Sequence, residues 1–207
     1  MKIIKNMPFF AILAAFGLSM LTASSAAIAT EQQVKQCYLD VKYKDFKKAL
    51  DTCLVAAETG DAGAQLEYGS LFYFDYKEVP KDYDKTKKWI SKSADQGNAS
   101  AEHTMGEIYD FGLGVEPDKE LAFSWYKKAA NQRIAGAQIN VGIMYFDGTG
   151  TPADKVLAYT WIKVAVHRAG DMAQGILDEM AGSLNDTQIA TASTNATKIL
   201  TRLYPPE

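Results

Sequence analysis

The chain has 207 residues, a hydrophobic fraction of 47%, a charged fraction of 23% and a formal net charge of −3 at pH 7. This length allows one good core but is short for two full domains, and the composition argues against a long disordered linker. The acidic balance argues against a nucleic-acid partner, because phosphate contacts need clustered Lys and Arg.

Residues 1–29 have the pattern of a secretory signal peptide. A short basic start precedes an apolar run over residues 8–21, and small residues then end in Ala-Ile-Ala at positions 27–29. The apolar run is short for a membrane span, which needs about 20 residues. We therefore expect cleavage after Ala29, a periplasmic or secreted mature chain and no integral membrane span in it. An uncleaved N-terminal anchor is the alternative.

The two cysteines, Cys37 and Cys53, both follow the expected cleavage site. An even number of cysteines in an exported chain favours one disulfide, and two antiparallel helices joined by a short turn would bring this pair within bridging distance. Two reduced cysteines in the core are the alternative. The sequence has no C-x-x-C spacing, which argues against a redox-active pair.

An internal repeat organises residues 30–207 into a single domain. Trp89, Trp125 and Trp161 recur at equal intervals, and aligning the chain on them also aligns glycines and aromatic residues. The predicted repeats cover about residues 64–100, 101–136 and 137–172. The positions that recur for structural reasons are Gly69, Trp89, Gly106, Gly112, Gly114, Trp125, Gly142, Gly148, Gly150 and Trp161.

Each repeat has the pattern of two helices. In the second repeat Ala101, Met105 and Ile108 fall on one helical face, and Gly106 has no side chain to keep a neighbouring helix away. The second half begins at Asp118, a favourable N-cap residue, as Asp154 is in the third repeat. Between the halves lies a Gly-x-Gly pair. Because the third repeat copies it, the pair indicates a turn with positive φ rather than a phosphate-binding loop.

Segments of similar character flank the repeats. A helix over about residues 31–39 is expected to pair with a helix that contains Cys53, and residues 170–182 begin a further first-half helix. The more polar segment after it can be capped by Asn185 or Asp186, and we expect it to form a terminal capping helix. The turns between repeats contain Gly or Asn, which permit a left-handed cap.

The second repeat carries a distinctive set of small, aromatic and capping residues: Gly106, Tyr109, Gly112, Gly114, Val115, Asp118, Ala122, Trp125, Tyr126, Lys128, Ala129, Ala130 and Gln132. This pattern resembles the Sel-one-like repeat family, relatives of tetratricopeptide repeats, and in particular its exported bacterial type. The third repeat departs from it at Thr151 and Ile162, and the first lacks both loop glycines. The resemblance implies an all-α fold. That fold is an α-solenoid of antiparallel helix pairs, with about three full repeats, flanking half-repeats and a C-terminal capping helix.

The resemblance also implies a function, because members of this family act as adaptors or scaffolds. We expect a non-enzymatic protein–protein interaction scaffold, exported to the cell envelope, that binds a protein or peptide in its concave groove as a monomer. Cysteine-rich secreted relatives imply one alternative, a cell-wall-related protein that binds or hydrolyses β-lactams. A secreted factor that acts on a host cell is the other alternative.

Catalytic and metal sites are not indicated. His103 and His167 lie far apart in the sequence, without Cys, Asp or Glu at metal-ligand spacing, so we expect no metal site and interpret His103 as a partly exposed helix residue. The G-x-S-x-G motif of α/β-hydrolases does not occur, and we expect no S-x-x-K serine nucleophile of the kind that β-lactamases and penicillin-binding proteins use. We predict no catalytic residues and no cofactor.

The candidate binding residues lie on the first-half helices, at positions whose residue changes from repeat to repeat. The packing positions of the same helices keep similar residues. The candidates are Glu67, Ser70, Thr104, Glu107, Asn140 and Ile143. Residues 71–76, with the sequence LFYFDY, add an aromatic cluster in which Phe72 holds the packing position. The others either pack a longer loop or line a ligand surface, and Tyr73 is our candidate for the second role.

Overall fold

The computed structural model describes residues 30–205, so the expected signal peptide at 1–29 lies outside the described residues. The described chain is all-α, apart from an isolated β-bridge between Tyr76 and Val79. Residues 30–42 are helical and are followed by α2 (Phe46–Glu58), α3 (Ala62–Ser70), α4 (Tyr83–Asp95), α5 (Ala99–Phe111), α6 (Lys119–Asn131), α7 (Ala135–Asp147), α8 (Lys155–Ala169), α9 (Asp171–Ala181) and α10 (Asp186–Leu203). None of these described helices is both long and apolar enough to cross a membrane.

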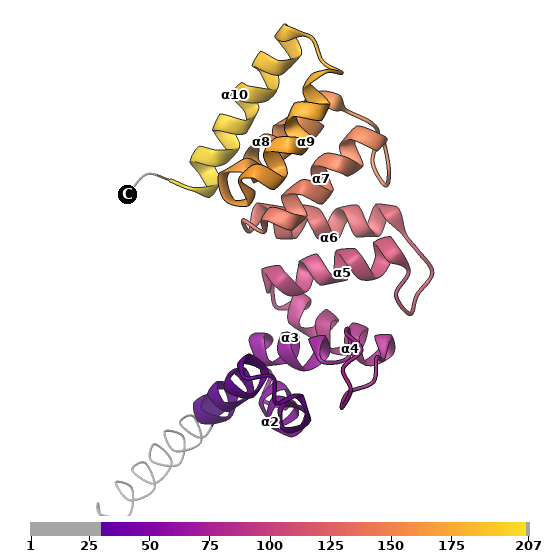
Figure 1. The fold of residues 1–207 in the computed structure, drawn as a ribbon, viewed down its shortest axis with the longest axis vertical. Helices are drawn as coiled ribbons and strands as arrows, with labels where there is room; N and C mark the ends of the chain where they lie inside the picture. Colours follow the sequence, from indigo (N-terminus) through magenta and orange to yellow (C-terminus); the bar gives the residue numbers. More distant parts are fainter. Residues whose placement is uncertain (1–29, 206–207) are drawn as a thin grey trace, which may run out of the picture.

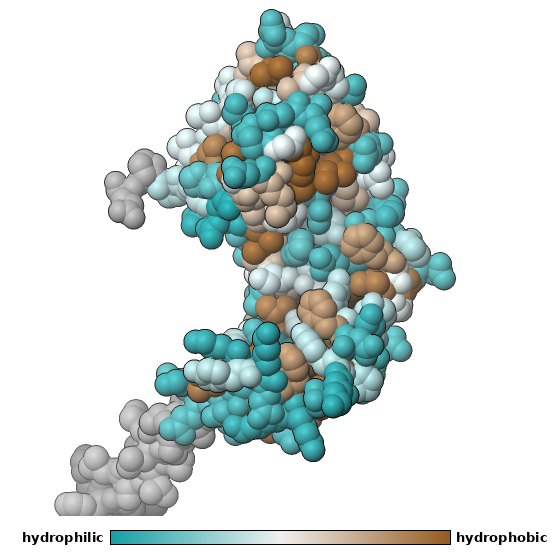
Figure 2. Space-filling model, viewed as in Figure 1, coloured by the Kyte–Doolittle hydropathy of each residue, from teal (hydrophilic) through white to brown (hydrophobic). Residues whose placement is uncertain are grey.

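The helices stack in chain order, which confirms the predicted α-solenoid. Each helix from α2 to α8 packs against the next one, and Figure 1 shows the resulting arch from α2 at one end to α10 at the other. Figure 2 shows that the arch is hollowed on one side. We call α3, α5 and α7 the first helices of the repeats and α4, α6 and α8 the second helices.

Aspartate and asparagine side chains define where several helices begin. The Asp118 carboxylate accepts a hydrogen bond from the Leu121 N–H at 2.8 Å, and the Asp154 carboxylate accepts one from the Leu157 N–H at 2.9 Å. Asn185 caps α10 within a capping box. These side chains satisfy backbone donors that have no partner in the first helical turn, so the chain encodes its helix starts locally.

One glycine lets each first helix lie close to the second helix of its own repeat. The contacts are Gly69 with Ile90, Gly106 with Tyr126 and Gly142 with Ile162. A Cβ added at Gly106 would lie 2.9 Å from Cγ of Tyr126 and nearer still to two other ring atoms. The tyrosine ring is fully buried and has no free space to move into, so the glycine is a packing requirement at this position.

Each repeat tryptophan connects its own helix with the preceding second helix. Trp125 shares a hydrophobic cluster with Ile90 of α4, and Trp161 shares one with Ala122 of α6. Trp89 packs in the same way with residues of α2. The large indole groups therefore contribute apolar contact between repeats, where alanines keep the helices close.

Most left-handed turn residues are glycines, and the exceptions among the described residues are Lys44 and Arg133. Gly112 and Gly148 end α5 and α7 with φ of 68° and 71°. Between repeats Gly97 has a φ of 80°, but at the next turn the left-handed residue is Arg133, with a φ of 73°. The expectation of Gly or Asn is wrong there. The Arg133 guanidinium lies 5.2 Å from the ring centroid of Tyr204, a contact that glycine could not make.

The predicted disulfide joins the first two described helices. Cys37 lies in the helix over residues 30–42 and Cys53 lies in α2, with Cα atoms 4.6 Å apart, and both side chains are fully buried. The buried carboxylate of Asp40 links the same helices, because it accepts hydrogen bonds from Lys48 Nζ at 2.9 Å and Thr52 Oγ1 at 2.8 Å. This hairpin is therefore held by one covalent and one polar link.

The C-terminal helix caps the solenoid from an unexpected side. α10 packs against α8 more extensively than against α9, the helix that precedes it. Val164 of α8 is fully buried under α10, whereas Lys92 and Lys128 are exposed at the corresponding positions of α4 and α6. Arg202 Nη2 also donates to Asn131 Oδ1 at 2.9 Å. The capping helix therefore reaches the turn between the second and third repeats.

A glutamine at the end of a second helix anchors the neighbouring first helix. Gln132 Nε2 donates to Glu102 Oε2 at 2.8 Å, and Glu102 is only 6% exposed. The first repeat has the same arrangement. In the third repeat Arg168 occupies this position, and the buried Oε1 of Gln138 has no hydrogen-bond partner among the described residues.

This difference gives a paired prediction. Gln132→Ala should lower the free energy of unfolding by about 2 kcal/mol, because the buried Glu102 carboxylate loses its donor. Arg168→Gln should raise it by about 1 kcal/mol by supplying a donor to Gln138. Urea unfolding of the two variants measures both effects. Equal stability of Gln132→Ala and the parent chain would show that the Glu102 contact is not a structural link.

Candidate functional site

The free surface of the first helices is the candidate site. α5 packs between α4 and α6, and α7 packs between α6 and α8, so each first helix keeps one face that no second helix covers. The predicted binding residues lie about one turn apart on each helix and share this face. They are Glu67 and Ser70 on α3, Thr104 and Glu107 on α5, and Asn140 and Ile143 on α7. We call these six residues, with Tyr73, Phe74, His103, Asp110 and Phe111, the first-helix face.

Side chains on this face meet between neighbouring repeats. The hydroxyl of Tyr73, in the loop after α3, donates to Glu107 Oε2 of α5 at 3.4 Å. The Asn140 Nδ2 atom of α7 lies 3.4 Å from His103 Nε2 of α5. His103 is half-buried and belongs to the first-helix face. Its isolated position in the sequence gave no indication of this contact. The spacing of the repeats gives no signal for such pairs, because they depend on the angle between successive helices.

Asp110 is the carboxylate of the first-helix face that forms an ion pair. Lys119 Nζ lies 2.6 Å from its Oδ1, and the Tyr126 hydroxyl lies 3.3 Å from its Oδ2. Burial raises the pKa of Glu107 above the usual range of a carboxyl group, although the hydrogen bond from Tyr73 acts in the opposite direction. Burial, together with the nearby Glu107, raises the pKa of Tyr73 to about 12, so its hydroxyl remains a donor.

Large hydrophobic side chains are exposed beside these polar groups. The exposed fractions are 53% for Phe74, 65% for Phe111 and 38% for Ile143. Phe74 and Phe111 occupy the same position of successive repeats. Single exposed hydrophobic residues are common, but a row of them next to half-buried polar groups is typical of interaction surfaces.

Some aromatic side chains of residues 71–76 pack inside the protein, and others lie at its surface. Phe72 is buried, and the Tyr76 ring stacks on Phe46 of α2 with centroids 3.9 Å apart. Tyr73 is half-buried against Tyr83 and Phe74, whereas Phe74 extends into solvent. The loop therefore uses two of its aromatic residues to hold its own shape and presents the other two on the first-helix face.

Comparison with known proteins identifies the repeats. A model of the Sel1 repeat family matches residues 62–98, 99–133 and 135–166. This chain belongs to the Sel1 repeat family. The Sel1 repeat commonly mediates protein–protein interaction, and its fold is typically a non-enzymatic scaffold.

Solved structures show the same Sel1 architecture. A protective antigen present in uropathogenic Escherichia coli, which displays an SLR fold, has a TM-score of 0.77 and 24% identity, covering 85% of this chain and 38% of the antigen. A Sel1 repeat protein from Oxalobacter formigenes has a TM-score of 0.57 and 31% identity, covering 63% of this chain and 97% of its own. This chain thus spans less than half the length of the antigen. No curated protein matches it.

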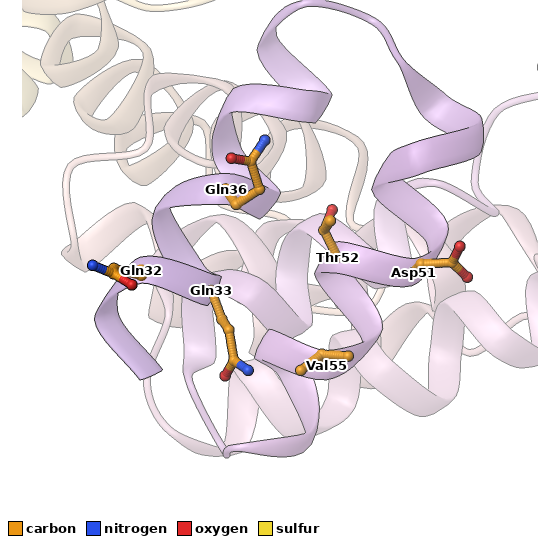
Figure 3. Close-up of a pocket in the computed structure, with 6 residues that line it drawn as sticks. All are labelled: Gln32, Gln33, Gln36, Asp51, Thr52 and Val55. Carbon is orange, nitrogen blue, oxygen red and sulfur yellow. The ribbon is translucent and has the colours of Figure 1, made fainter. Parts of the chain in front are cut away.

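A cavity at the N-terminal end of the Sel1 solenoid is not lined by any of the predicted binding residues. Its volume is about 550 Å³, and Figure 3 shows the residues that line it: Gln32, Gln33, Gln36, Asp51, Thr52 and Val55. Asp51 points away from the three glutamines in this view. Gln36 and Thr52 donate to Asp40, so these groups serve the fold of the first hairpin. The cavity lacks a set of convergent polar groups.

The second Sel1 repeat contains one spacing that the sequence interpretation missed. Ser124 and Lys127 form an S-x-x-K sequence, which serine acyl enzymes use. Ser124 Oγ donates to the Leu121 carbonyl at 2.7 Å, and Lys127 Nζ lies 3.2 Å from Tyr145 Oη and 4.5 Å from the Trp161 ring centroid. The lysine is directed to aromatic rings rather than to the serine. Within residues 30–205 no cluster of His, Cys, Asp and Glu could hold a metal ion.

Proposed function

We propose that this Sel1 repeat protein is a non-enzymatic scaffold, exported to the cell envelope, that binds a segment of a protein along the first-helix face. One observation carries the proposal. The packing positions recur from helix to helix, whereas one shared position of this face holds Glu67, Thr104 and Asn140 in turn. A surface whose accessible positions differ on a constant framework is suited to the selection of a partner.

The disulfide supports the proposed location. The Cys37–Cys53 bond closes the first described hairpin, and disulfides persist in oxidising compartments such as the periplasm and the extracellular space. The signal-peptide pattern over residues 1–29 agrees with this location. We place the mature chain in the periplasm or outside the cell, as a monomer with the bound segment along the first-helix face.

Site-specific photo-cross-linking in the native cell envelope tests the proposal. Thr104 on α5 and Ser124 on α6 form a matched pair, because each is a small hydroxyl residue that donates to a backbone carbonyl of its own helix. With benzoylphenylalanine at position 104 we expect one protein to be cross-linked. With the same group at position 124 we expect no such adduct. Equal adducts from both positions, or an adduct from position 124 alone, would contradict the proposed surface.

A double variant provides the second arm of this test. Glu107→Ala with Asn140→Ala should remove the adduct formed from position 104. It should leave the melting temperature unchanged, because both side chains are only half-buried. A parallel loss of folding would assign these residues to stability instead of binding.

A further inference from the structure

The charges of the solenoid are divided between its two kinds of helix. The first helices α3, α5 and α7 contain no Lys or Arg, whereas α4, α6 and α8 each contain several. The acidic residues on the first helices are Glu67, Glu102, Glu107, Asp110 and Asp147. α9, which continues the series of first helices, also lacks Lys and Arg. The face that the second helices leave free is therefore acidic.

Two glutamates on this face have no cation of their own. The ion pairs within residues 30–205 are Lys48–Asp40, Lys85–Asp82 and Lys119–Asp110. Glu67 and Glu107 take no part in them. His103 does not compensate, because burial lowers its pKa and keeps the ring neutral at pH 7. Burial also raises the pKa of both glutamates, so these carboxylates have already lost part of their hydration.

Aromatic rings on the same face also lack a cation. On the second helices the protein's own lysines cover the tryptophans, as Lys128 does at 3.7 Å from the Trp125 centroid. Among the described residues no cation lies over Tyr73, Phe74 or Phe111 in this way. Rings next to carboxylates can hold both the charged head and the apolar stem of a Lys or Arg side chain.

We propose that the first-helix face takes a basic segment of a partner protein, in which Lys or Arg residues alternate with apolar ones. The cationic groups lie at Glu67 and Glu107, and the apolar side chains pack on Phe74, Phe111 and Ile143. Charge complementarity selects this occupant, since the face offers acceptors and rings, and the Lys119 cation beside it is already paired with Asp110. The inference rests on the proposed scaffold function and adds the chemistry of its partner.

The test uses the folded protein with its disulfide intact and three short fluorescent peptides. The peptides share one pattern of Leu, Ala and Gly and carry Lys, Gln or Glu at the remaining positions. By fluorescence anisotropy we expect the Lys peptide to bind at least about tenfold more tightly than the Gln peptide, and the Glu peptide more weakly still. Glu67→Gln with Glu107→Gln should weaken binding of the Lys peptide by about tenfold.

A control variant separates local from general electrostatic attraction. Glu58→Gln with Glu120→Gln changes the net charge equally but lies on α2 and α6, and it should alter affinity by less than about twofold. Equal weakening by both double variants would overturn the proposal. So would a Gln peptide that binds as tightly as the Lys peptide, or no binding by any peptide. In these cases the adduct at position 104 still decides separately whether the face is a protein-binding surface.

Discussion

Replacing Gly106 by valine is expected to lower the free energy of unfolding by about 3 kcal/mol. Any Cβ at this position would overlap the ring of Tyr126, whose side chain is fully buried between α5 and α6. Relief would require a shift of the tyrosine into a filled core or a separation of the two helices, and both lose apolar contacts. Urea unfolding followed by circular dichroism measures the change.

Gly175 supplies the matched control for this substitution. It also lies within a helix, α9, but a Cβ there would meet no atom within 4 Å. Gly175→Val should therefore change stability by less than about 0.5 kcal/mol, because valine is no worse than glycine in a helix. If both variants lost the same stability, the overlap with Tyr126 would not be the reason for the glycine at position 106.

Loss of the disulfide should cost a similar amount. Replacing Cys37 and Cys53 by alanine should lower the free energy of unfolding by about 3 kcal/mol, the loop-closure entropy expected for their sequence separation of 16 residues. The Asp40 hydrogen bonds would still join the two helices, so we expect a destabilised hairpin rather than an unfolded protein.

Reducing agent distinguishes the covalent link from the change of side chain. Dithiothreitol should destabilise the parent protein by about the same amount and should not affect the alanine variant further. A parent protein that shows two free thiols by mass spectrometry after purification from the periplasm would contradict the bond itself. Equal stability of the parent and the alanine variant would contradict its structural role.

The framework of the solenoid could be predicted because its packing positions repeat. The three tryptophans give the period, and the glycines upstream of them lie where helices come closest, as at Gly106 and Tyr126. The disulfide also followed from sequence, since a helical hairpin brings Cys37 and Cys53 together. Each of these features depends on the spacing of residues along the chain and on the size of a side chain. Both can be read directly from the sequence.

Features that depend on the angles between helices could not be predicted. The contact of Tyr73 with Glu107 arises between repeats and has no sequence signal. The position of α10 against α8 is different, because it has a sequence signal: Val164 replaces the exposed lysine of the two earlier repeats, which indicates a covered surface. The left-handed Arg133 lies where the preceding turn has Gly97, and its guanidinium contacts Tyr204 of the C-terminal segment, which the repeat pattern does not describe.

Chemical-shift mapping with the Lys peptide locates the surface on which a basic protein segment binds. We expect the amide signals that move to be those of α3, α5 and α7, centred on Glu67, Thr104 and Glu107, and to move less in the Glu67→Gln, Glu107→Gln variant. Shifts confined to the lysine-bearing surface of α4 and α6, or spread evenly over the molecule, would contradict this expectation.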